Sequence, residues 1–385
     1  MKLQLFLKCI SPIFLLASFF IKRDENKYIF GEWLGLSYSD SSKYIFETAL
    51  QEKNKNVMWI TKSRNIYEKL MAMGRPVNYA YSVRGIYHQI TSKYFICTVS
   101  SRDINCFTCG FGSKVIMLGH GLPIKEQSHN FTPFEKIKRF IRFKTIDKYY
   151  KSASESEFFD DIASRQYHLK KNDLIRIPSA RCDVFREKLN NAQRNDFLHI
   201  NNINENQFNI VYLPTHRNEG HNVDEILKAL DDLDVSAELI NKKLKCSIKI
   251  HVKAHHYDSD LIVNNTYKNV NILNFSTDLN SLFQNADVFI GDYSGVCYDF
   301  IYFQKPMIAY VPDYKNYVSS SRNLYCKLEE IYGVVIYDNK ELNNTLEKLV
   351  HAKCNKDNLF LPKYKRILPT NLSFSLECWK KITEC

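Results

Sequence analysis

Polar side chains that bind or move phosphate groups recur at four places in this chain, each directly after a run of apolar residues typical of a β-strand. The four sets are His120 and Lys125 in GHGLPIK, Thr215 and Arg217 in PTHR, Lys253 and His255 in HVKAHH, and Asp292, Ser294 and Gly295 in GDYSG. Open α/β sheets bind ligands beyond the carboxyl ends of their strands, so we predict that these residues line one active site.

His120 lies between two glycines after the apolar run KVIML, which places its imidazole on a tight turn at the end of a predicted strand. The alternative interpretation is a buried histidine whose ring bonds a backbone carbonyl. The flanking glycines leave the ring little cover from neighbouring side chains, which favours a functional role. A neutral imidazole can take a proton from an attacking hydroxyl, so we predict that His120 is a general base.

Arg217 and the HVKAHH segment supply cations and imidazoles suited to a diphosphate. A guanidinium can donate to two phosphate oxygens at once, and Arg217 follows a predicted strand and a Pro-Thr turn. If HVKAHH ends a strand, its side chains at His251, Lys253 and His255 share one face, while His256 points to the other. A metal site is the alternative, but a lysine between two candidate ligands repels a divalent cation. We therefore predict a phosphate clamp at Lys253 and His255, and no metal site.

The segment GDYSGVCYDFIYF is typical of a strand that turns into a helix. The predicted apolar stripe of that helix consists of Val296, Phe300 and Phe303. Ser294 is the predicted N-cap, and the first backbone N–H groups, including that of Gly295, would be free to bind an anion. A helix cap without any ligand is the alternative. The hydroxyl, the small glycine and the preceding Asp292 favour a diphosphate site.

Alternating strand and helix patterns predict an α/β protein of two domains. The strand-like runs of the first domain lie at residues 56–61, 94–100, 114–120 and 173–180. Those of the second lie at 208–213, 247–252, 269–275, 286–294, 306–311 and 334–338. Helix-length segments separate these runs, which is typical of βαβ units and parallel sheets. The asparagine-rich stretch 189–207 is the predicted linker. We therefore predict two Rossmann-like domains, 24–190 and 208–385, with a cleft between them.

Composition limits the partners and the compartment of the chain. Of its 385 residues, 45% are hydrophobic, and 53 Lys and Arg against 42 Asp and Glu give a net charge of +11. This excess favours anionic partners, but no helix-turn-helix, RNP or zinc-finger pattern supports nucleic-acid binding. The 11 cysteines are an odd number, which favours a reducing cytosol over a disulfide framework. Cys106 and Cys109 have the spacing of a metal or redox pair, but no second pair follows, so we predict a structural role.

The first 23 residues combine an apolar run, 10–21, with basic residues on both sides, among them Lys22 and Arg23. The run is short for a transmembrane helix, and no clear cleavage site follows it. We predict that residues 1–23 form an interfacial anchor on the cytoplasmic side of a membrane, with a transmembrane span and a buried core helix as alternatives. The basic stretch 136–151 is predicted to contact anionic lipid as well.

Together these motifs resemble those of the CDP-glycerol glycerophosphotransferase family, whose members prime or polymerise teichoic acids and related capsular polymers. The family motifs HGTPLK, PTWR and TDYSS have their counterparts here in HGLPIK, PTHR and GDYSG. Lys-x-His-Pro corresponds to residues 253–256, a following Lys-Pro to residues 305–306, and Pro-Arg-x-Asp, stretched by two residues, to residues 178–183. The resemblance covers nearly the whole chain, beginning with FGEWLGLSYSDSSKYIFETAL near the start.

The resemblance implies a GT-B fold, peripheral attachment to the inner membrane face, and transfer of a polyol phosphate from a CDP carrier with release of CMP. It also implies two important histidines, which map onto His120 and His255. His216 stands where the family has tryptophan, His256 where it has proline, and Gly295 where it has the second serine. These departures are expected to shift the choice of donor or acceptor while the phosphate chemistry is kept.

The predicted function is therefore transfer of glycerol phosphate or another polyol phosphate from CDP-glycerol or CDP-ribitol to a polymer or lipid-linked acceptor in teichoic acid or capsule synthesis. His120 and His255 are the predicted catalytic residues. The predicted substrate-binding residues are Lys125, Thr215, Arg217, Lys253, Asp292, Ser294 and Gly295. No cofactor is expected, and no residue pattern indicates a divalent cation. A GT-B glycosyltransferase that uses a nucleotide sugar and a polymer-binding protein without activity are the alternatives.

Overall fold

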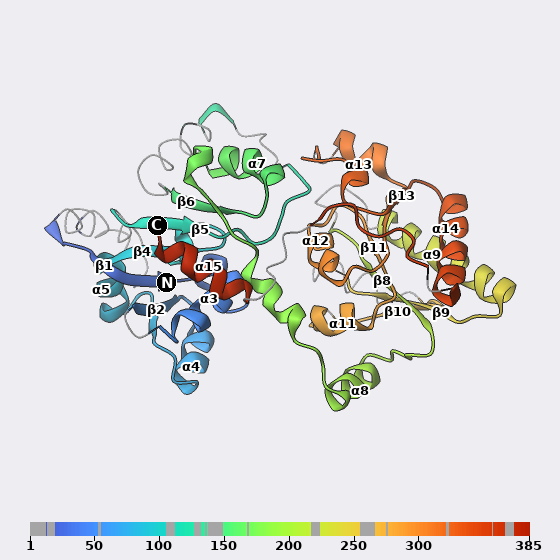
Figure 1. Ribbon diagram of the computed structural model, residues 1–385, viewed down its shortest axis with the longest axis horizontal. Coiled ribbons are helices and arrows are strands. Elements are labelled where there is room, and N and C mark those ends of the chain that lie inside the picture. The colour runs from blue at the N-terminus through green and yellow to red at the C-terminus, as the bar shows by residue number, and fades with distance from the viewer. Residues whose placement is uncertain are drawn as a thin grey trace. The chain divides into compact units, whose positions relative to one another are not determined.

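In the computed structural model the chain forms two compact units, and each is described by itself (Figure 1). The first unit consists of Met1–Gly121, His129–Asp183 and Ile367–Cys385, and the second of Leu122–Ser128 and Val184–Arg366. The structure describes residues 13, 20–52, 55–104, 112–126, 132–134, 137, 149–167, 169–216, 224–254, 266–274, 276–320, 323–355, 357–365 and 373–385. The prediction of an α/β chain with two Rossmann-like halves is confirmed.

The sheet of the first unit has seven strands, all of them parallel. Across the sheet their order is β3 (Val77–Tyr79), β2 (Asn56–Thr61), β1 (Asp24–Phe30), β4 (Ser92–Cys97), β5 (Lys114–Met117), β6 (Tyr149–Ser154) and β7 (Leu174–Arg176). The central strands are apolar on both faces because helices cover both. Trp59 and Phe46 pack in the core on one face, and Ile60 and Phe95 pack in the core on the other.

Short polar side chains cap several helices of this unit. The helices are α3 (Ser41–Ala49), α4 (Arg64–Ala72), α5 (Val83–Thr91) and α7 (Glu157–Tyr167), with 3-10 turns η1 (Trp33–Gly35), η2 (Ser101–Asp103), η3 (Lys171–Asp173) and η4 (Ala180–Arg186). Ser82 caps α5, where its hydroxyl accepts a hydrogen bond from the Gly85 amide at 3.0 Å. Such caps satisfy amide groups that a helix start leaves without a partner.

The chain leaves β1 toward β2 and β3 on one side and later continues from β4 toward β7 on the other. The loops that follow β1 and β4 therefore separate at a topological switch point, the position where open α/β sheets bind their ligands. η1 follows β1, and η2 follows β4. His120 comes after β5, which is the neighbour of β4 in the sheet. The loops after β1, β4 and β5 therefore all lie at the carboxyl edge of this sheet.

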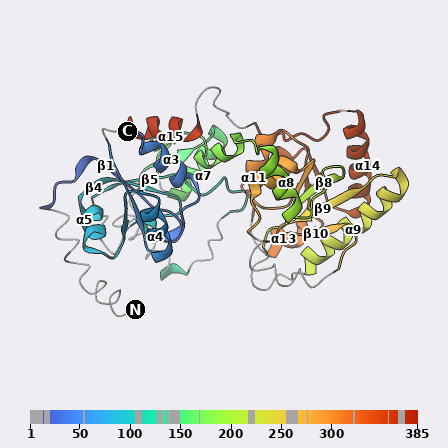
Figure 2. The same cartoon turned by 90° about the horizontal axis from the view of Figure 1, so that it is seen from below.

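The last helix, α15 (Phe374–Thr383), belongs to the first unit, whereas the predicted second domain included it. The Asp183 carboxylate accepts hydrogen bonds from the amides of Phe374 at 2.6 Å and Ser375 at 2.8 Å. Trp379 is buried and meets the Tyr28 ring edge-on at a centroid distance of 5.0 Å. Figures 1 and 2 both show α15 beside α3.

The second unit has a sheet of six parallel strands. Their order is β10 (Val270–Ile272), β9 (Ile248–Val252), β8 (Phe208–Leu213), β11 (Val288–Gly291), β12 (Met307–Tyr310) and β13 (Val334–Ile336). The helices are α8 (Asn191–Ile200), α9 (Asp224–Leu244), α11 (Leu279–Asn285), α12 (Cys297–Phe300), α13 (Tyr314–Ser320) and α14 (Asn339–Asn355), with short turns η5 (Ile301–Phe303) and η6 (Leu328–Glu330). One core cluster joins α9 and α14 to this sheet.

The predicted linker 189–207 contains a helix, α8, and belongs to the second unit. Asn190 caps it, because its side chain accepts a hydrogen bond from the Gln193 amide at 2.9 Å while the Gln193 side chain accepts one from the Asn190 amide at 3.1 Å. Arg194 of α8 donates to the Asn285 side chain at 2.8 Å, which ties α8 to the end of α11. The capping residues therefore favour a helix in a stretch whose composition predicts a linker.

Candidate active site

His120 lies on an exposed turn after β5 in the first unit. Gly119 and Gly121 on either side have φ angles of +72° and +119°, which residues other than glycine rarely adopt. The ring of His120 lies 5.2 Å from the ring of Trp33, centroid to centroid, at an interplanar angle of 58°. The turn is where the sequence predicts it, and its imidazole is open to a substrate.

Arg181 holds the backbone of this turn in place. Its Nη1 donates to the carbonyl oxygen of His120 at 2.8 Å and lies 3.3 Å from Oδ2 of the buried Asp40. A Cβ at Gly121 would lie only 2.7 Å from Nη2 of Arg181, so glycine leaves room for the guanidinium. In the sequence Arg181 is recognisable only as part of the stretched family element at residues 178–183, and its contact with His120 depends on the fold.

The motif GHGLPIK is divided between the units, because Gly121 ends one segment of the first unit and Leu122 begins the second. Within the second unit, the Tyr325 amide donates to the Ile124 carbonyl at 2.8 Å, and the Glu126 amide donates to the Asn323 carbonyl at 2.8 Å. Lys125 lies in this antiparallel pairing opposite Leu324. The structure thus assigns Lys125 to the second unit and His120 to the first.

The residues of the second unit that are predicted to bind substrate follow three neighbouring strands. Thr215 follows β8, Lys253 follows β9, and Asp292, Ser294 and Gly295 follow β11. Because β9, β8 and β11 are adjacent and parallel, these residues come to the same edge of the sheet. The order of the strands reverses between β8 and β11, so this edge is also a switch point.

Asp292 joins two of these strand ends from a buried position. Its carboxylate accepts hydrogen bonds from the Thr215 amide at 2.9 Å, the Thr215 hydroxyl at 2.5 Å and the Tyr293 amide at 2.6 Å. Asp292 is fully buried, and Thr215 nearly so. Their side chains bond to each other and so fix the loops at this edge, and their predicted role in substrate binding stays a prediction.

Ser294 does not cap a helix, in contrast to the prediction. α12 has only four residues, Cys297–Phe300, and its N-cap is Val296. The Ser294 hydroxyl instead accepts a long hydrogen bond of 3.4 Å from the Val296 amide. A Cβ at Gly295 would overlap the carbonyl oxygen of Leu122, so glycine at this position allows the segment after His120 to pack closely in the second unit.

His251 is a structural residue of β9. It is fully buried, with Nε2 at 2.9 Å from Asn209 Oδ1 and Nδ1 at 3.2 Å from Asn271 Nδ2. These partners fit a neutral ring that donates from Nε2 and accepts at Nδ1. Burial, with a contribution from Lys249, lowers the pKa of His251 to about 4. The side chain of Lys253 is half-buried, and burial lowers its pKa too.

Three predicted residues, Arg217, His255 and His256, lie outside the described residues, as do Cys106 and Cys109. Lys305, which corresponds to the Lys of the family's Lys-Pro, is described and has a structural role. Its Nζ donates to three carbonyl oxygens at and near the end of α11, among them Ala286 at 2.6 Å. Burial lowers its pKa to about 8.

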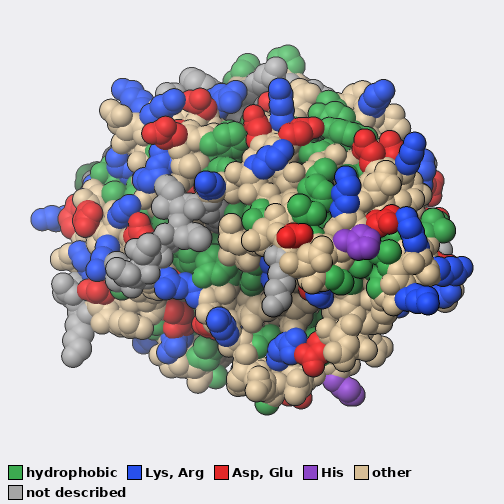
Figure 3. All heavy atoms as spheres, turned by 45° about the vertical axis from the view of Figure 1, so that its right-hand side comes forward, with side chains coloured by type: hydrophobic (Ala, Val, Ile, Leu, Met, Phe, Trp, Pro, Cys, Tyr) green, Lys and Arg blue, Asp and Glu red, His purple; other side chains and the backbone are tan. Residues whose placement is uncertain are grey.

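Charge and metal-ligand patterns add no second catalytic candidate. On the face shown in Figure 3, Lys and Arg side chains alternate with Asp and Glu, so the net positive charge is not gathered into one patch there. Among the described residues, no group of three or more His, Cys, Asp or Glu side chains is placed to hold a metal ion. No helix in that part of the chain is both long and apolar enough to cross a membrane.

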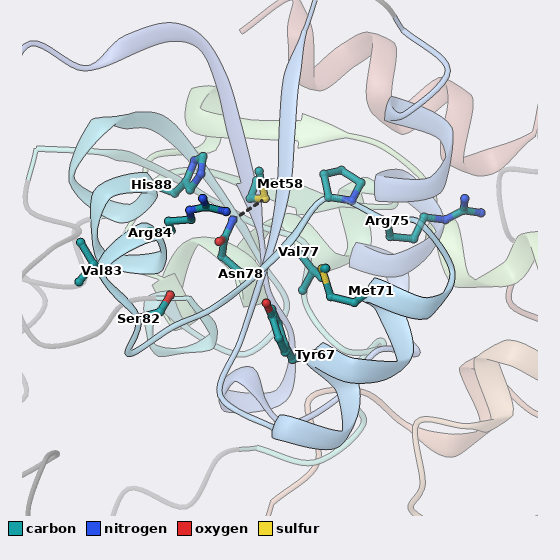
Figure 4. A pocket seen from close by; sticks show the side chains of 11 residues that line it. Met58, Tyr67, Met71, Arg75, Val77, Asn78, Ser82, Val83, Arg84 and His88 are labelled. Atoms are coloured by element: carbon teal, nitrogen blue, oxygen red, sulfur yellow. Dashed lines mark hydrogen bonds between the residues drawn. The ribbon is translucent and has the colours of Figure 1, made fainter.

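A cavity of about 670 Å³ opens at the edge of the first sheet, around β3 (Figure 4). Apolar residues such as Met58 and Met71 line part of it, and its polar side chains are Arg75, Asn78, Ser82, Arg84 and His88. Burial and the nearby cations Lys27 and Arg84 lower the pKa of His88 to about 4. None of the predicted site residues lines this cavity, and β3 is four strands away from β5 across the sheet.

Comparison with known proteins relates this geometry to an enzyme family. The family model of CDP-Glycerol:Poly(glycerophosphate) glycerophosphotransferase matches residues 13–370. The teichoic acid poly(glycerol phosphate) polymerase of Bacillus spizizenii is 25% identical over 324 residues, 80% of each chain. That of Staphylococcus epidermidis is 23% identical over 87% of this chain, which spans only 48% of that relative. The solved structure of the wall teichoic acid polymerase TagF, a histidine-to-asparagine variant with CDPG, superposes with a TM-score of 0.67 at 19% identity, covering 90% of this chain and 85% of that one.

Proposed function

The chain belongs to the CDP-glycerol:poly(glycerophosphate) glycerophosphotransferase family, and on this premise we propose that it transfers a polyol phosphate from a CDP carrier to a hydroxyl of a teichoic acid polymer. In this reaction the acceptor oxygen attacks the β-phosphorus of the donor. A new phosphodiester bond forms, the bond from the β-phosphorus to the bridging oxygen breaks, and CMP leaves. The scheme requires no resident cofactor.

The position of His120 is the observation that carries this proposal. The imidazole is exposed at the carboxyl edge of a parallel sheet, and Arg181 fixes its backbone. In our proposal His120 accepts the proton of the attacking hydroxyl while the new bond to phosphorus forms. The buried Asp40 forms an ion pair with Arg181 and so keeps the guanidinium in position to bind the His120 carbonyl.

The donor is proposed to bind at the carboxyl edge of the second sheet. Lys253, after β9, contributes positive charge at the same sheet edge as the turn of Ser294 and Gly295, which follows β11. The resemblance adds Arg217 and His255 as further ligands of the diphosphate. Phosphoryl transfer depends mainly on positioning and on electrostatic stabilisation of the departing group, and cationic and hydrogen-bonding side chains supply both.

Attachment to the cytoplasmic side of the inner membrane is part of the proposal. Side chains that are strongly exposed and apolar support it at Phe20 (88% exposed), Phe134 (75%) and Ile137 (58%). Phe134 and Ile137 are three residues apart in a sequence rich in Lys and Arg, the pattern of a helix that lies on anionic lipid. Loss of sedimentation with anionic vesicles after deletion of residues 1–23 would support the N-terminal anchor, and unchanged sedimentation would contradict it.

The function is tested by CMP release from the purified full-length protein, supplied with CDP-glycerol, CDP-ribitol or UDP-sugars and a glycerol phosphate acceptor. We expect release from one CDP-polyol and a loss of about 100- to 10,000-fold in His120→Asn, the range that a general base contributes. His199→Asn, at an exposed position of α8, is the control. Turnover of a UDP-sugar alone would favour a glycosyltransferase and contradict the proposal.

A further inference from the structure

The loop after β1 contains two bulky residues in a conformation that is normally left to glycine. Trp33 has φ +43° and Leu34 has φ +59°, yet their side chains are 45% and 40% exposed. Left-handed backbone at residues of this size is rare, and such strain concentrates at functional sites. The exposed indole is also the ring that contacts His120.

Two buried carboxylates hold this loop in its strained form. Glu32 accepts hydrogen bonds from the amides of Ser39 at 2.9 Å and Asp40 at 2.8 Å, and burial raises its pKa. Asp103 accepts from the Leu34 amide at 2.9 Å and from the Thr98 amide at 2.8 Å. Both carboxylates are fully buried, so their role is to fix the backbone and present Trp33 outward.

Two cations near the loop, Lys62 and Arg102, reach solvent. Lys62 packs against Gly35, where a Cβ would lie 3.0 Å from its Cγ, and its Nζ donates to the carbonyl of Arg102. Arg102 is exposed and belongs to η2, which contacts η1. The negative charges of Glu32 and Asp103 are buried and hydrogen-bonded. An exposed apolar surface with cations beside it thus lies next to His120.

We propose that Trp33 and Leu34, with Lys62 and Arg102 beside them, form the binding platform for the polyol phosphate chain of the acceptor. This inference rests on the proposed function. A chain of polyol phosphates alternates carbon segments with anionic phosphates, and the platform combines an indole face for C–H groups with cations for phosphate. Trp33 binds the polyol unit whose hydroxyl is presented to His120.

Tryptophan fluorescence tests the platform without any need for turnover. The chain has three tryptophans, and Trp59 and Trp379 are 0% and 2% exposed, so Trp33 alone can respond to a ligand at the surface. We expect a defined glycerol phosphate oligomer to shift the emission to shorter wavelength and to reduce quenching by acrylamide. Trp33→Phe should abolish both changes. Inorganic polyphosphate, which lacks carbon segments, should leave the emission unchanged.

Steady-state kinetics separates a binding platform from a structural role. Trp33→Ala should raise the acceptor KM by roughly three- to tenfold, the value of one aromatic contact, with little change in the donor KM. Trp33→Phe should recover most of this loss. Arg102→Gln should weaken oligomer binding more at low than at high ionic strength. Met73→Ala, at a residue of the same unit that is 44% exposed, is the control.

An unchanged acceptor KM in Trp33→Ala would overturn the proposal, and so would oligomer binding, measured by calorimetry, that leaves the wild-type emission unchanged. Absence of oligomer binding would overturn it as well. If the wild-type protein releases no CMP from any CDP-polyol but binds the oligomer with the expected emission change, the proposed function fails while the platform stands. Turnover with an unaffected acceptor KM in Trp33→Ala gives the opposite result.

Discussion

Acidification should destabilise the second unit through His251. This ring lies between Asn209 and Asn271 in its neutral form, and its pKa is lowered to about 4 by burial. In the unfolded chain the pKa of histidine is about 6.5. Since the folded pKa is the lower one, the unfolded chain binds the proton first as the pH falls. The stabilisation is therefore complete above pH 6.5 and is lost progressively down to about pH 4.

The two pKa values set the size of the effect. The free energy of unfolding should fall by roughly 1 kcal/mol between pH 7.5 and 5.5, and by roughly 2–3 kcal/mol between pH 7.5 and 4.5. Removal of the titrating ring in His251→Gln should lower the stability at pH 7.5, because the Asn209 and Asn271 side chains lose their partner. On acidification, His251→Gln should lose less stability than the wild type. The difference between the two proteins should be about the fall calculated above for each pH interval.

The assay has to report on the second unit alone. The three tryptophans all lie in the first unit, so their fluorescence cannot follow it. Hydrogen exchange of peptides from β8 and β9, measured by mass spectrometry and corrected for the chemical exchange rate at each pH, gives the free energy of opening locally. Equal acid sensitivity of wild type and His251→Gln in these peptides would refute the reasoning. His199→Gln, at an exposed position of α8, is the control.

Two further substitutions test the first unit. Arg181→Gln should lower kcat by about tenfold to a hundredfold, because the turn of His120 loses its support. Arg176→Gln, which removes the ion pair with Asp160, is the control and should leave kcat unchanged. Similar kcat values for the two variants in saturating substrate would contradict this role of Arg181. Trp379→Ala should lower the free energy of unfolding by about 3–5 kcal/mol in urea titrations followed by Trp59 fluorescence, whereas Lys380→Ala on the exposed face of α15 should change it little; a small loss in Trp379→Ala would mean that α15 contributes little to this core.

Hydrophobic pattern and strand-end chemistry were enough to predict both parallel sheets and the edges at which the polar motifs gather. The reason is local: apolar strands alternate with helices, and parallel strands put their carboxyl ends on one side. His120 and Lys253 are where this argument places them. The prediction of Ser294 as an N-cap was wrong because a stripe of apolar residues does not reveal that the helix is one turn long and starts later.

Other features depend on partners far away in the sequence. Asp183 binds the start of α15, 191 residues later, and no local pattern announces that pairing. Arg181 meets Asp40 and the carbonyl of His120 only once three separate loops have come together. The strain at Trp33 is equally hidden in the sequence, although one signal was available. The short stretch GEWLG places a tryptophan beside an acidic residue and between two glycines, and no amphipathic pattern explains it.

The return of α15 to the first unit bears on how the protein is made. A ribosome adds about 5–20 residues per second, so the 191 residues that separate Asp183 from Phe374 correspond to a wait of roughly 10–40 s. During that time the surface of Tyr28 and Phe30 that Trp379 later covers stays open on the nascent chain. The second unit, which is continuous from Val184 to Arg366 apart from one short segment made earlier, can fold in this interval. Completion of the first unit therefore has to wait until the second unit has been synthesised, and until then Tyr28 and Phe30 lack the cover of Trp379.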